Sequence, residues 1–249
     1  MNIVGIIPAR YASTRFPGKP LAMIQGKPMI QHVFERVHAI PELSDTVVAT
    51  DDERIFKTVL DFGGKAVMTS SNHKSGTDRC GEVLKTMIDN HCQPDVVINI
   101  QGDEPFVEQT QIEQLIHCFN DSSVQIATLE KKITSTEELF SPNVVKVVCD
   151  SSGNALYFSR FAIPFQRGAE QSQWIHNHQY FKHIGIYAYR SQTLLKLINL
   201  SQSLLEKSES LEQLRWLENG FAIRVQETNH ENIAIDTPED LLKLKNNIL

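Results

Sequence analysis

The stretch "NIVGIIPARYASTRFPGKPL", residues 2–21, joins a short apolar run to a loop rich in positive charge. The first part is continuously apolar, which is typical of a strand that is buried on both faces of a parallel sheet. The loop that follows contains Arg10, Arg15 and Lys19 and no acidic residue, although the whole chain has a net charge of −6. Such a local excess of positive charge indicates an anionic ligand rather than a generally basic surface.

The composition excludes several classes of protein. Of the 249 residues, 41% are hydrophobic, yet no apolar run reaches the roughly 18 residues expected of a membrane span. The net negative charge argues against a coating role on nucleic acid. The N-terminus lacks the basic region of a signal peptide, and the four cysteines lack zinc-site spacing. We therefore expect a cytoplasmic protein with reduced thiols, no nucleic-acid partner and no membrane insertion.

Strand patterns alternate with helical patterns through the first half of the chain. Apolar periodicity predicts the strands at 2–8, 45–50, 65–69, 95–102 and 124–133, and the helices at 27–40, 53–64, 78–89 and 109–119. Alternation of this kind predicts an α/β fold with a doubly wound, mainly parallel sheet.

The pattern changes after about residue 140. A hairpin over 143–159 and a polar segment at 166–180, read as a loop, are expected first. The later elements are predicted as a strand at 183–190, helices at 191–199 and 203–218, strands at 221–226 and 232–236, and a helix from Pro238. We predict a single domain with a nucleotide-binding half (about 1–140), an inserted α+β lobe (about 141–220), and a C-terminal strand and helix (221–249) that return to the core.

The loop at 8–20 has the properties of an anion cradle. It leaves the carboxyl end of the first strand, where open α/β sheets bind their ligands. Arginine can grip phosphate oxygens in pairs, and lysine acts as a point charge. Neither G-x-G-x-x-G nor G-x-x-x-x-G-K-[ST] follows the strand, which argues against a dinucleotide-binding dehydrogenase and a P-loop protein. The alternative is a solvated basic loop.

Several ordered blocks carry a resemblance to a known family. They are "IIPARYASTRFPGKPL", "VATDDERI", "MTSSNHKSGTDR", "INIQGDEP", "NVVKVVCD", "ALYFSRFAIPF", "KHIGIYAYR", "LEQLRWLENG" and "IAIDTPEDL". Together they closely resemble the bacterial 3-deoxy-manno-octulosonate cytidylyltransferases, also called CMP-Kdo synthetases, over essentially the whole chain. The resemblance implies a fold like that of nucleotide-diphospho-sugar transferases. It also implies CTP and an acidic keto-sugar as substrates, a homodimer, and a role in lipopolysaccharide biosynthesis.

The same resemblance implies the site residues. Those expected at the nucleotide are Pro8, Ala9, Arg10, Ser13, Arg15, Lys19, Ser75, Gly76, Thr77, Arg79, Gln101 and Asp103. Those expected at the sugar are Arg160, His183, Tyr187, Glu212 and Gln213. The residues expected to act in catalysis are Arg10, Arg15, Lys19, Asp103 and Asp236. Taken singly, each residue of the sugar set is more often a polar group of the surface or the core. The competing interpretation of the block at 73–79 is a helix N-cap with its loop.

Two carboxylates are candidate ligands for Mg²⁺. Asp103 follows the strand at 95–102, and Asp236 precedes Thr237, which can cap the last helix. Mg²⁺ prefers oxygen ligands and usually combines one or two carboxylates with phosphates and water, and the family resemblance implies these two residues. The competing interpretation of Asp103 is simple turn chemistry. Glu104 is expected on the surface of that turn, and Asp51 at a helix N-terminus that favours acids.

The resemblance implies that the anomeric hydroxyl of the sugar acid attacks the α-phosphorus of CTP and expels pyrophosphate. Two alternatives stay open: a metal-dependent glycosyltransferase that consumes a sugar nucleotide, and a non-enzymatic regulator that binds CTP. The segment at 166–180, with Arg167 and Trp174, departs most from the family. It could shape the acceptor pocket or form a variable loop.

Overall fold

The chain divides into two units that interleave in sequence. The computed structural model describes residues 1–13, 16–231, 235 and 237–247. Unit 1 comprises residues 1–113, 189–198 and 232–249, and unit 2 comprises residues 114–188 and 199–231. The boundaries proposed near residues 140 and 220 for a nucleotide half and an inserted lobe stay predictions.

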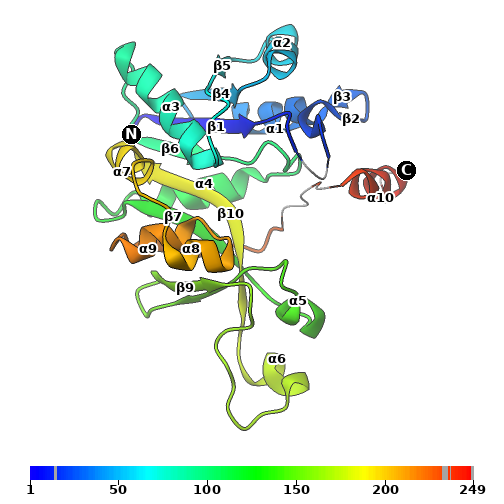
Figure 1. Ribbon diagram of the computed structural model, residues 1–249, viewed down its shortest axis with the longest axis vertical. Coiled ribbons are helices and arrows are strands. Elements are labelled where there is room, and N and C mark those ends of the chain that lie inside the picture. Colours follow the sequence, from blue (N-terminus) through cyan, green and yellow to red (C-terminus); the bar gives the residue numbers. More distant parts are fainter. Residues whose placement is uncertain (14–15, 232–234, 236, 248–249) are drawn as a thin grey trace. The chain divides into compact units, whose positions relative to one another are not determined.

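Unit 1 is built on parallel strands, which Figure 1 shows in blue to green. They are β1 (Ile3–Ala9), β4 (Asp45–Thr50), β5 (Ala66–Met68) and β6 (Val96–Asn99), in the spatial order β6-β1-β4-β5. Ile6 of β1 lies opposite Val47 on one side and Asn99 on the other. The continuous apolar runs form strands because β1 and its neighbours are covered on both faces. The predicted parallel, doubly wound arrangement is confirmed.

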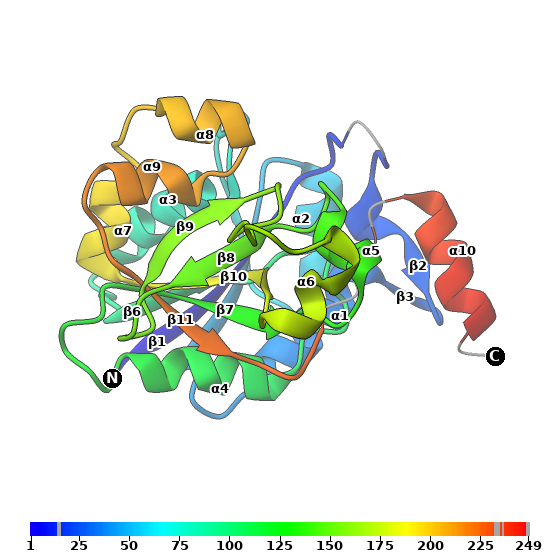
Figure 2. The same ribbon diagram turned by 90° about the horizontal axis from the view of Figure 1, so that it is seen from below.

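Helices cover both faces of these strands. Unit 1 contains α1 (Met29–His38), α2 (Glu53–Asp61), α3 (Gly76–Asp89), α7 (Ser191–Leu197) and α10 (Pro238–Asn247), and α4 (Gln109–Cys118) begins in it. A Cβ on Gly5 would lie 3.0 Å from Val37 of α1. Pro8 lies three residues after Gly5 on β1, so the two residues point to opposite faces of the sheet. Gly76 of α3 packs against Pro8. Consequently α1 and α3 pack on opposite faces (Figure 2).

The helix caps follow from the sequence. Asp52 accepts a hydrogen bond from the Arg54 N–H at the start of α2, at 2.9 Å. Thr237 caps α10 as predicted, since its hydroxyl accepts from the Asp240 N–H at 3.2 Å. The strand expected at 232–236 lies outside the described residues except for Ile235, whose N–H donates to the Asp103 carbonyl at 3.2 Å.

Unit 2 contains the antiparallel part of the fold. Its strands are β7 (Ile126–Lys132), β8 (Lys146–Cys149), β9 (Ala155–Ser159), β10 (Phe181–Arg190, of which the last two residues belong to unit 1) and β11 (Ile223–Glu227). Strand β7 lies between β11 and β10, and β8 pairs antiparallel with both β10 and β9. Its short helices are α5 (Thr136–Phe140), α6 (Trp174–Asn177), α8 (Leu204–Glu209) and α9 (Gln213–Glu218). The predicted hairpin over 143–159 is confirmed.

Two expectations for unit 2 are wrong. The helix expected over 203–218 is two helices, because Ser210 adopts a left-handed backbone with φ of +53° and ends α8. The polar segment at 166–180 is more than a loop, since it contains α6. Its Trp174 is only 1% exposed and packs with Leu139 and Tyr180 in a core cluster. Trp174 therefore serves the core of unit 2.

Among the described residues, no helix has the length and the apolar character needed to cross a membrane.

Replacing Trp174 tests whether the segment at 166–180 is part of the fold. We expect Trp174→Ala to lower the free energy of unfolding by about 3–5 kcal/mol, because it leaves a cavity among packed aromatic side chains. The control is Gln173→Ala, since Gln173 is the exposed neighbour. Denaturant unfolding measures both, and equal midpoints for the two variants would contradict the assignment.

Candidate functional site

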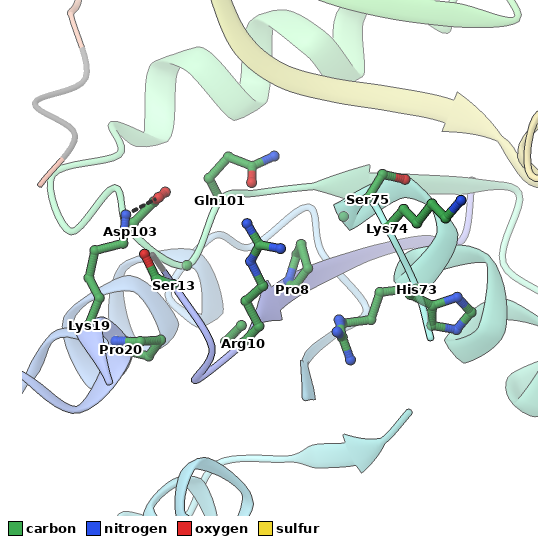
Figure 3. A pocket seen from close by; sticks show the side chains of 14 residues that line it. Pro8, Arg10, Ser13, Lys19, Pro20, His73, Lys74, Ser75, Gln101 and Asp103 are labelled. Atoms are coloured by element: carbon green, nitrogen blue, oxygen red, sulfur yellow. Dashed lines mark hydrogen bonds and ion pairs between the residues drawn. The ribbon is translucent and has the colours of Figure 1, made fainter. Parts of the chain in front are cut away.

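A pocket of about 220 Å³ lies at the carboxyl ends of β1 and β6 in unit 1. Its lining residues are Pro8, Ala9, Arg10, Ser13, Lys19, Pro20, His73, Lys74, Ser75, Gly76, Arg79, Gln101, Gly102 and Asp103. Most of the residues expected at the nucleotide are therefore brought together in one cavity. Figure 3 shows Lys19 and Asp103 at one end of it, His73 and Lys74 at the other, and Arg10 between them.

An ion pair joins the loop after β1 to the turn after β6. The Lys19 ammonium donates to the Asp103 carboxylate at 2.6 Å (Figure 3). The Lys19 side chain is 10% exposed and that of Asp103 is 31% exposed, so the pair is partly shielded from water. Arg10, Lys74 and Arg79 add further positive charge to the lining. Such a surface attracts a polyanion.

Arg79 is held in place by residues that do not line the pocket. Its guanidinium donates to the Asp51 carboxylate at 3.1 Å and to the Thr69 hydroxyl, and the residue is only 3% exposed. The helix N-terminus expected at this block is confirmed with Asp52 as its cap, and Asp51, the residue before the cap, pairs with Arg79. A buried guanidinium needs such a partner.

The loop before α3 adds two side chains, an imidazole and an ammonium group, that the predicted residue set omits. His73 and Lys74 line the pocket directly before Ser75. The His73 ring contacts the Glu82 carboxylate, which also accepts from the Ser70 N–H at 2.8 Å. Burial raises the pKa of Glu82, but these hydrogen bonds outweigh it and the pKa lies below its usual range. The signal in the sequence is the block "NHKSG", which places the two residues next to predicted ones.

Ser75 and Gly76 have a structural role as well as a place in the lining. The Ser75 hydroxyl accepts from the Asp78 N–H at 3.1 Å and caps α3, so the helix-cap interpretation holds too. A Cβ on Gly76 would lie 3.1 Å from Pro8. A residue without a side chain therefore allows α3 to approach β1 closely at this point. Thr77, expected at the nucleotide, does not line the pocket: it is 2% exposed, and its hydroxyl lies 3.5 Å from that of Tyr189.

The acidic side chains differ in their fit to a metal ion. Asp103 presents a carboxylate to the pocket, whereas Glu104, expected on the turn surface, is buried with 8% exposure. Asp236 and Arg15 lie outside the described residues. Among the residues that are described, no group of three or more potential ligands could hold a metal ion by itself. Asp103 is thus the carboxylate that the described lining of the pocket offers to a cation.

In unit 2, the expected pair His183 and Tyr187 lies on one face of β10. Their ring centroids are 5.2 Å apart. The Thr128 hydroxyl lies 2.8 Å from the Ile186 carbonyl, to which it donates, so it accepts from His183 Nε2 at 2.9 Å. This arrangement leaves Nδ1 as the unprotonated nitrogen. Burial lowers the pKa of His183 to about 3, so the imidazole is neutral at physiological pH.

Arg160, at the end of β9, is anchored to main-chain carbonyls. Its guanidinium donates to Glu209 at 2.7 Å, to Pro142 at 3.1 Å and to Ser210 at 3.4 Å. Arginine has five N–H donors, so two remain for another acceptor. Among the other expected sugar residues, Gln213 is 5% exposed and begins α9, and the Glu212 carboxylate lies 3.7 Å from Arg215.

Lys146 is a buried cation beside this arginine that the predicted set also omits. Its ammonium donates to the carbonyls of Ser141 at 2.8 Å, Val144 at 2.5 Å and Arg160 at 2.6 Å. The residue is fully buried. Three acceptors satisfy the three donors of an ammonium group. Lys146 therefore fixes the loop before β8 to the end of β9.

Comparisons with known proteins identify the class. The family described as "Cytidylyltransferase" matches residues 4–232. A likeness of fold extends to a cytidylyltransferase from Leptospira borgpetersenii, with a TM-score of 0.62 at 16% identity over 98% of this chain and 85% of that one. The chain belongs to the cytidylyltransferase family, a class of nucleotidyltransferases.

More similar proteins share one name. The chain is 53% identical over 247 residues to a 3-deoxy-manno-octulosonate cytidylyltransferase of Parabacteroides distasonis, covering 98% of this chain and 96% of the relative. It is 55% identical over 244 residues to that of Bacteroides thetaiotaomicron, covering 97% and 96%. A solved CMP:2-keto-3-deoxy-manno-octonic acid synthetase in complex with CTP has a TM-score of 0.91 and 42% identity, covering 100% of this chain and 98% of that one. The family predicted from the sequence blocks is confirmed.

Replacing Lys146 tests its role in unit 2. We expect Lys146→Met to lower the free energy of unfolding by about 3 kcal/mol, because three buried carbonyls lose their donor. The same replacement at exposed Lys132 is the matched control, and we expect it to be nearly neutral. Denaturant unfolding distinguishes them. Full stability of the Lys146 variant would show that the carbonyls do not need this ammonium.

Proposed function

We propose that the chain transfers CMP from CTP to the anomeric hydroxyl of 3-deoxy-manno-octulosonate and releases pyrophosphate. The product is the CMP-activated sugar that lipopolysaccharide biosynthesis uses. The observation that carries this proposal is the pocket beyond β1 and β6, whose lining contains Arg10, Arg79 and the ion pair of Lys19 with Asp103. The near full-length similarity to relatives of this name supports the same substrates.

Charge complementarity assigns the triphosphate to the cationic loop. Arg10 lies in the first part of the loop, before residue 14, and Lys19 lies in the second part, after residue 15. Arg15 belongs to the same loop by sequence. These cations neutralise the β- and γ-phosphates and stabilise the leaving pyrophosphate. The attacking hydroxyl approaches the α-phosphorus from the side opposite the leaving group, so holding both reactants in line is the main task of the protein.

Asp103 and Asp236 are proposed to hold Mg²⁺ together with phosphate oxygens. Mg²⁺ bound there would polarise the α-phosphoryl group and orient the nucleophile. The Lys19 ammonium now lies against the Asp103 oxygen, so it has to move toward the phosphates when the metal and nucleotide bind. Lys19 then pairs with phosphate and Asp103 with the metal ion. Each group therefore still faces an opposite charge, which limits the free-energy cost of separating them.

Unit 2 is proposed to bind the sugar acid. The two remaining N–H groups of Arg160 suit its carboxylate, because guanidinium and carboxylate pair through two parallel hydrogen bonds. The bare Nδ1 of His183 can accept from a sugar hydroxyl, and Tyr187, Glu212 and Gln213 supply further polar groups.

Unit 2 is also the proposed site of homodimer formation. Leu156, Phe161 and Phe165 are 62%, 69% and 70% exposed, and large exposed apolar side chains are typical of an interface. Sedimentation as a monomer at micromolar concentration would contradict this dimer. We place the reaction in the cytoplasm, where CTP is available.

The experiment that tests the function is pyrophosphate release with CTP, Mg²⁺ and a panel of sugar acids that includes 3-deoxy-manno-octulosonate and its 8-amino analogue. We expect turnover with CTP and one of these acids. Turnover of a sugar nucleotide without pyrophosphate release would favour a glycosyltransferase. Binding of CTP with no turnover on any acid would favour a regulator.

Removing the Lys19 charge tests the role of the loop. We expect Lys19→Met to reduce kcat/KM for CTP by about 10²–10³-fold, the scale of losing one preorganised charged donor. The control is Lys27→Met, because Lys27 lies on the exposed hairpin strand β3 (Lys27–Pro28) and pairs with Glu35. Steady-state kinetics of both variants measure the difference, and equal values would remove Lys19 from the reaction.

Neutralising Asp103 tests the metal site independently of turnover. In the presence of CTP, we expect Asp103→Asn to weaken binding of Mn²⁺, used as a spectroscopic substitute for Mg²⁺, by at least about tenfold. Asp61→Asn, at an exposed position of α2, is the control. Electron paramagnetic resonance titration gives the affinities. Unchanged Mn²⁺ binding would exclude Asp103 as a ligand.

A further inference from the structure

The Tyr11 side chain lies on a guanidinium from a different element. The Arg54 Cζ is 3.3 Å from the centroid of the Tyr11 ring. Arg54 is itself held by Asp52, with Nε donating to Oδ1 at 2.9 Å and Nη2 to Oδ2 at 2.6 Å. Because Asp52 also caps α2, the plane of the guanidinium is fixed at the start of that helix. A fixed cation over an aromatic face is a favourable contact.

The Tyr11 ring also lies close to Gly18. A Cβ on Gly18 would lie 2.9 Å from two ring carbons, and the backbone there has φ of +72°, a conformation that favours glycine. The Gly18 N–H donates to the Tyr11 carbonyl at 2.9 Å, and the Ser13 N–H donates to the same oxygen at 3.0 Å. The Tyr11 carbonyl thus joins the part of the loop before residue 14 to the part after residue 15.

Tyr11 and Gly18 are the immediate neighbours of the two described cations of the loop. Arg10 and Lys19 line the pocket, whereas Tyr11, Gly18 and Arg54 do not. Without contacting a bound anion, the three residues can still order the backbone that carries Arg10 and Lys19. Binding is stronger when such groups are ordered in advance, because less conformational freedom is lost on association.

We propose that Tyr11, Gly18 and Arg54 form a clamp that presets the cationic loop for the triphosphate of CTP. This inference rests on the proposed function of the loop and adds three positioning residues to it. The clamp makes no contact with the phosphates. It anchors the loop to the N-terminus of α2 through the ring of Tyr11.

The test compares variants that break the clamp with variants that keep it. We expect Tyr11→Leu and Arg54→Gln to raise the dissociation constant of CTP by about three- to fivefold, the scale of a lost cation–π contact at an exposed site. The dissociation constant of cytidine, which has no phosphates, stays within twofold. Tyr11→Phe retains the ring and binds CTP like the unmodified protein. Lys57→Gln removes one charge from an exposed position of the same helix and controls for the loss of charge in Arg54→Gln.

The measurements distinguish the effect of the clamp residues from the effect of the phosphate-binding residues of the loop. Isothermal calorimetry gives both affinities, and the Lys19→Met variant is the reference for loss of a phosphate-binding group. If Lys19→Met weakens CTP while Tyr11→Leu and Arg54→Gln do not, the clamp is overturned and the proposed function stands. If the clamp variants weaken cytidine as much as CTP, their role is general stability and the clamp is overturned too. If Lys19→Met leaves CTP binding unchanged, the loop does not hold the triphosphate and both proposals fail.

Discussion

The ion pair between Lys19 and Asp103 is the interaction on which the candidate site depends. It joins the loop that leaves β1 to the turn that leaves β6, and these two strands are parallel neighbours. Parallel strands end on the same edge of the sheet, so charges carried by two distant stretches of sequence meet there. Within the pair, each charge neutralises the other. A nucleoside triphosphate offers the ammonium group an alternative partner of opposite charge.

An acidic chain can present a cationic pocket because its carboxylates stand behind the cations. Asp51 holds Arg79, and Glu82 holds His73. Asp52 anchors Arg54 under the Tyr11 ring in the same way. These carboxylates fix the direction of the side chains they contact. Among the described residues that line the pocket, Asp103 is the single acid. The anion therefore meets groups that are already oriented.

Two cations of unit 2 are ordered by another means. The Lys146 ammonium and the Arg160 guanidinium donate to main-chain carbonyls of the loops around them. Carbonyl oxygens carry no net charge, and the nearby Glu209 carboxylate accepts from the main-chain N–H of Arg160 at 2.9 Å rather than from its guanidinium. A guanidinium held in this way suits the proposed site for the carboxylate of an acidic sugar.

The sequence by itself determined the parallel strands and the place of the loop at 8–20, because apolar runs and an uncompensated cluster of charge are local properties. Ordered motifs determined the family. Only the tertiary structure decided that Asp51 serves Arg79, that Thr77 is buried, and that Trp174 belongs to a core cluster. The helix break at Ser210 was hidden as well, since serine gives no signal for a left-handed backbone. In each case the deciding partner is remote in sequence or the conformation depends on packing, and periodicity contains no information about either.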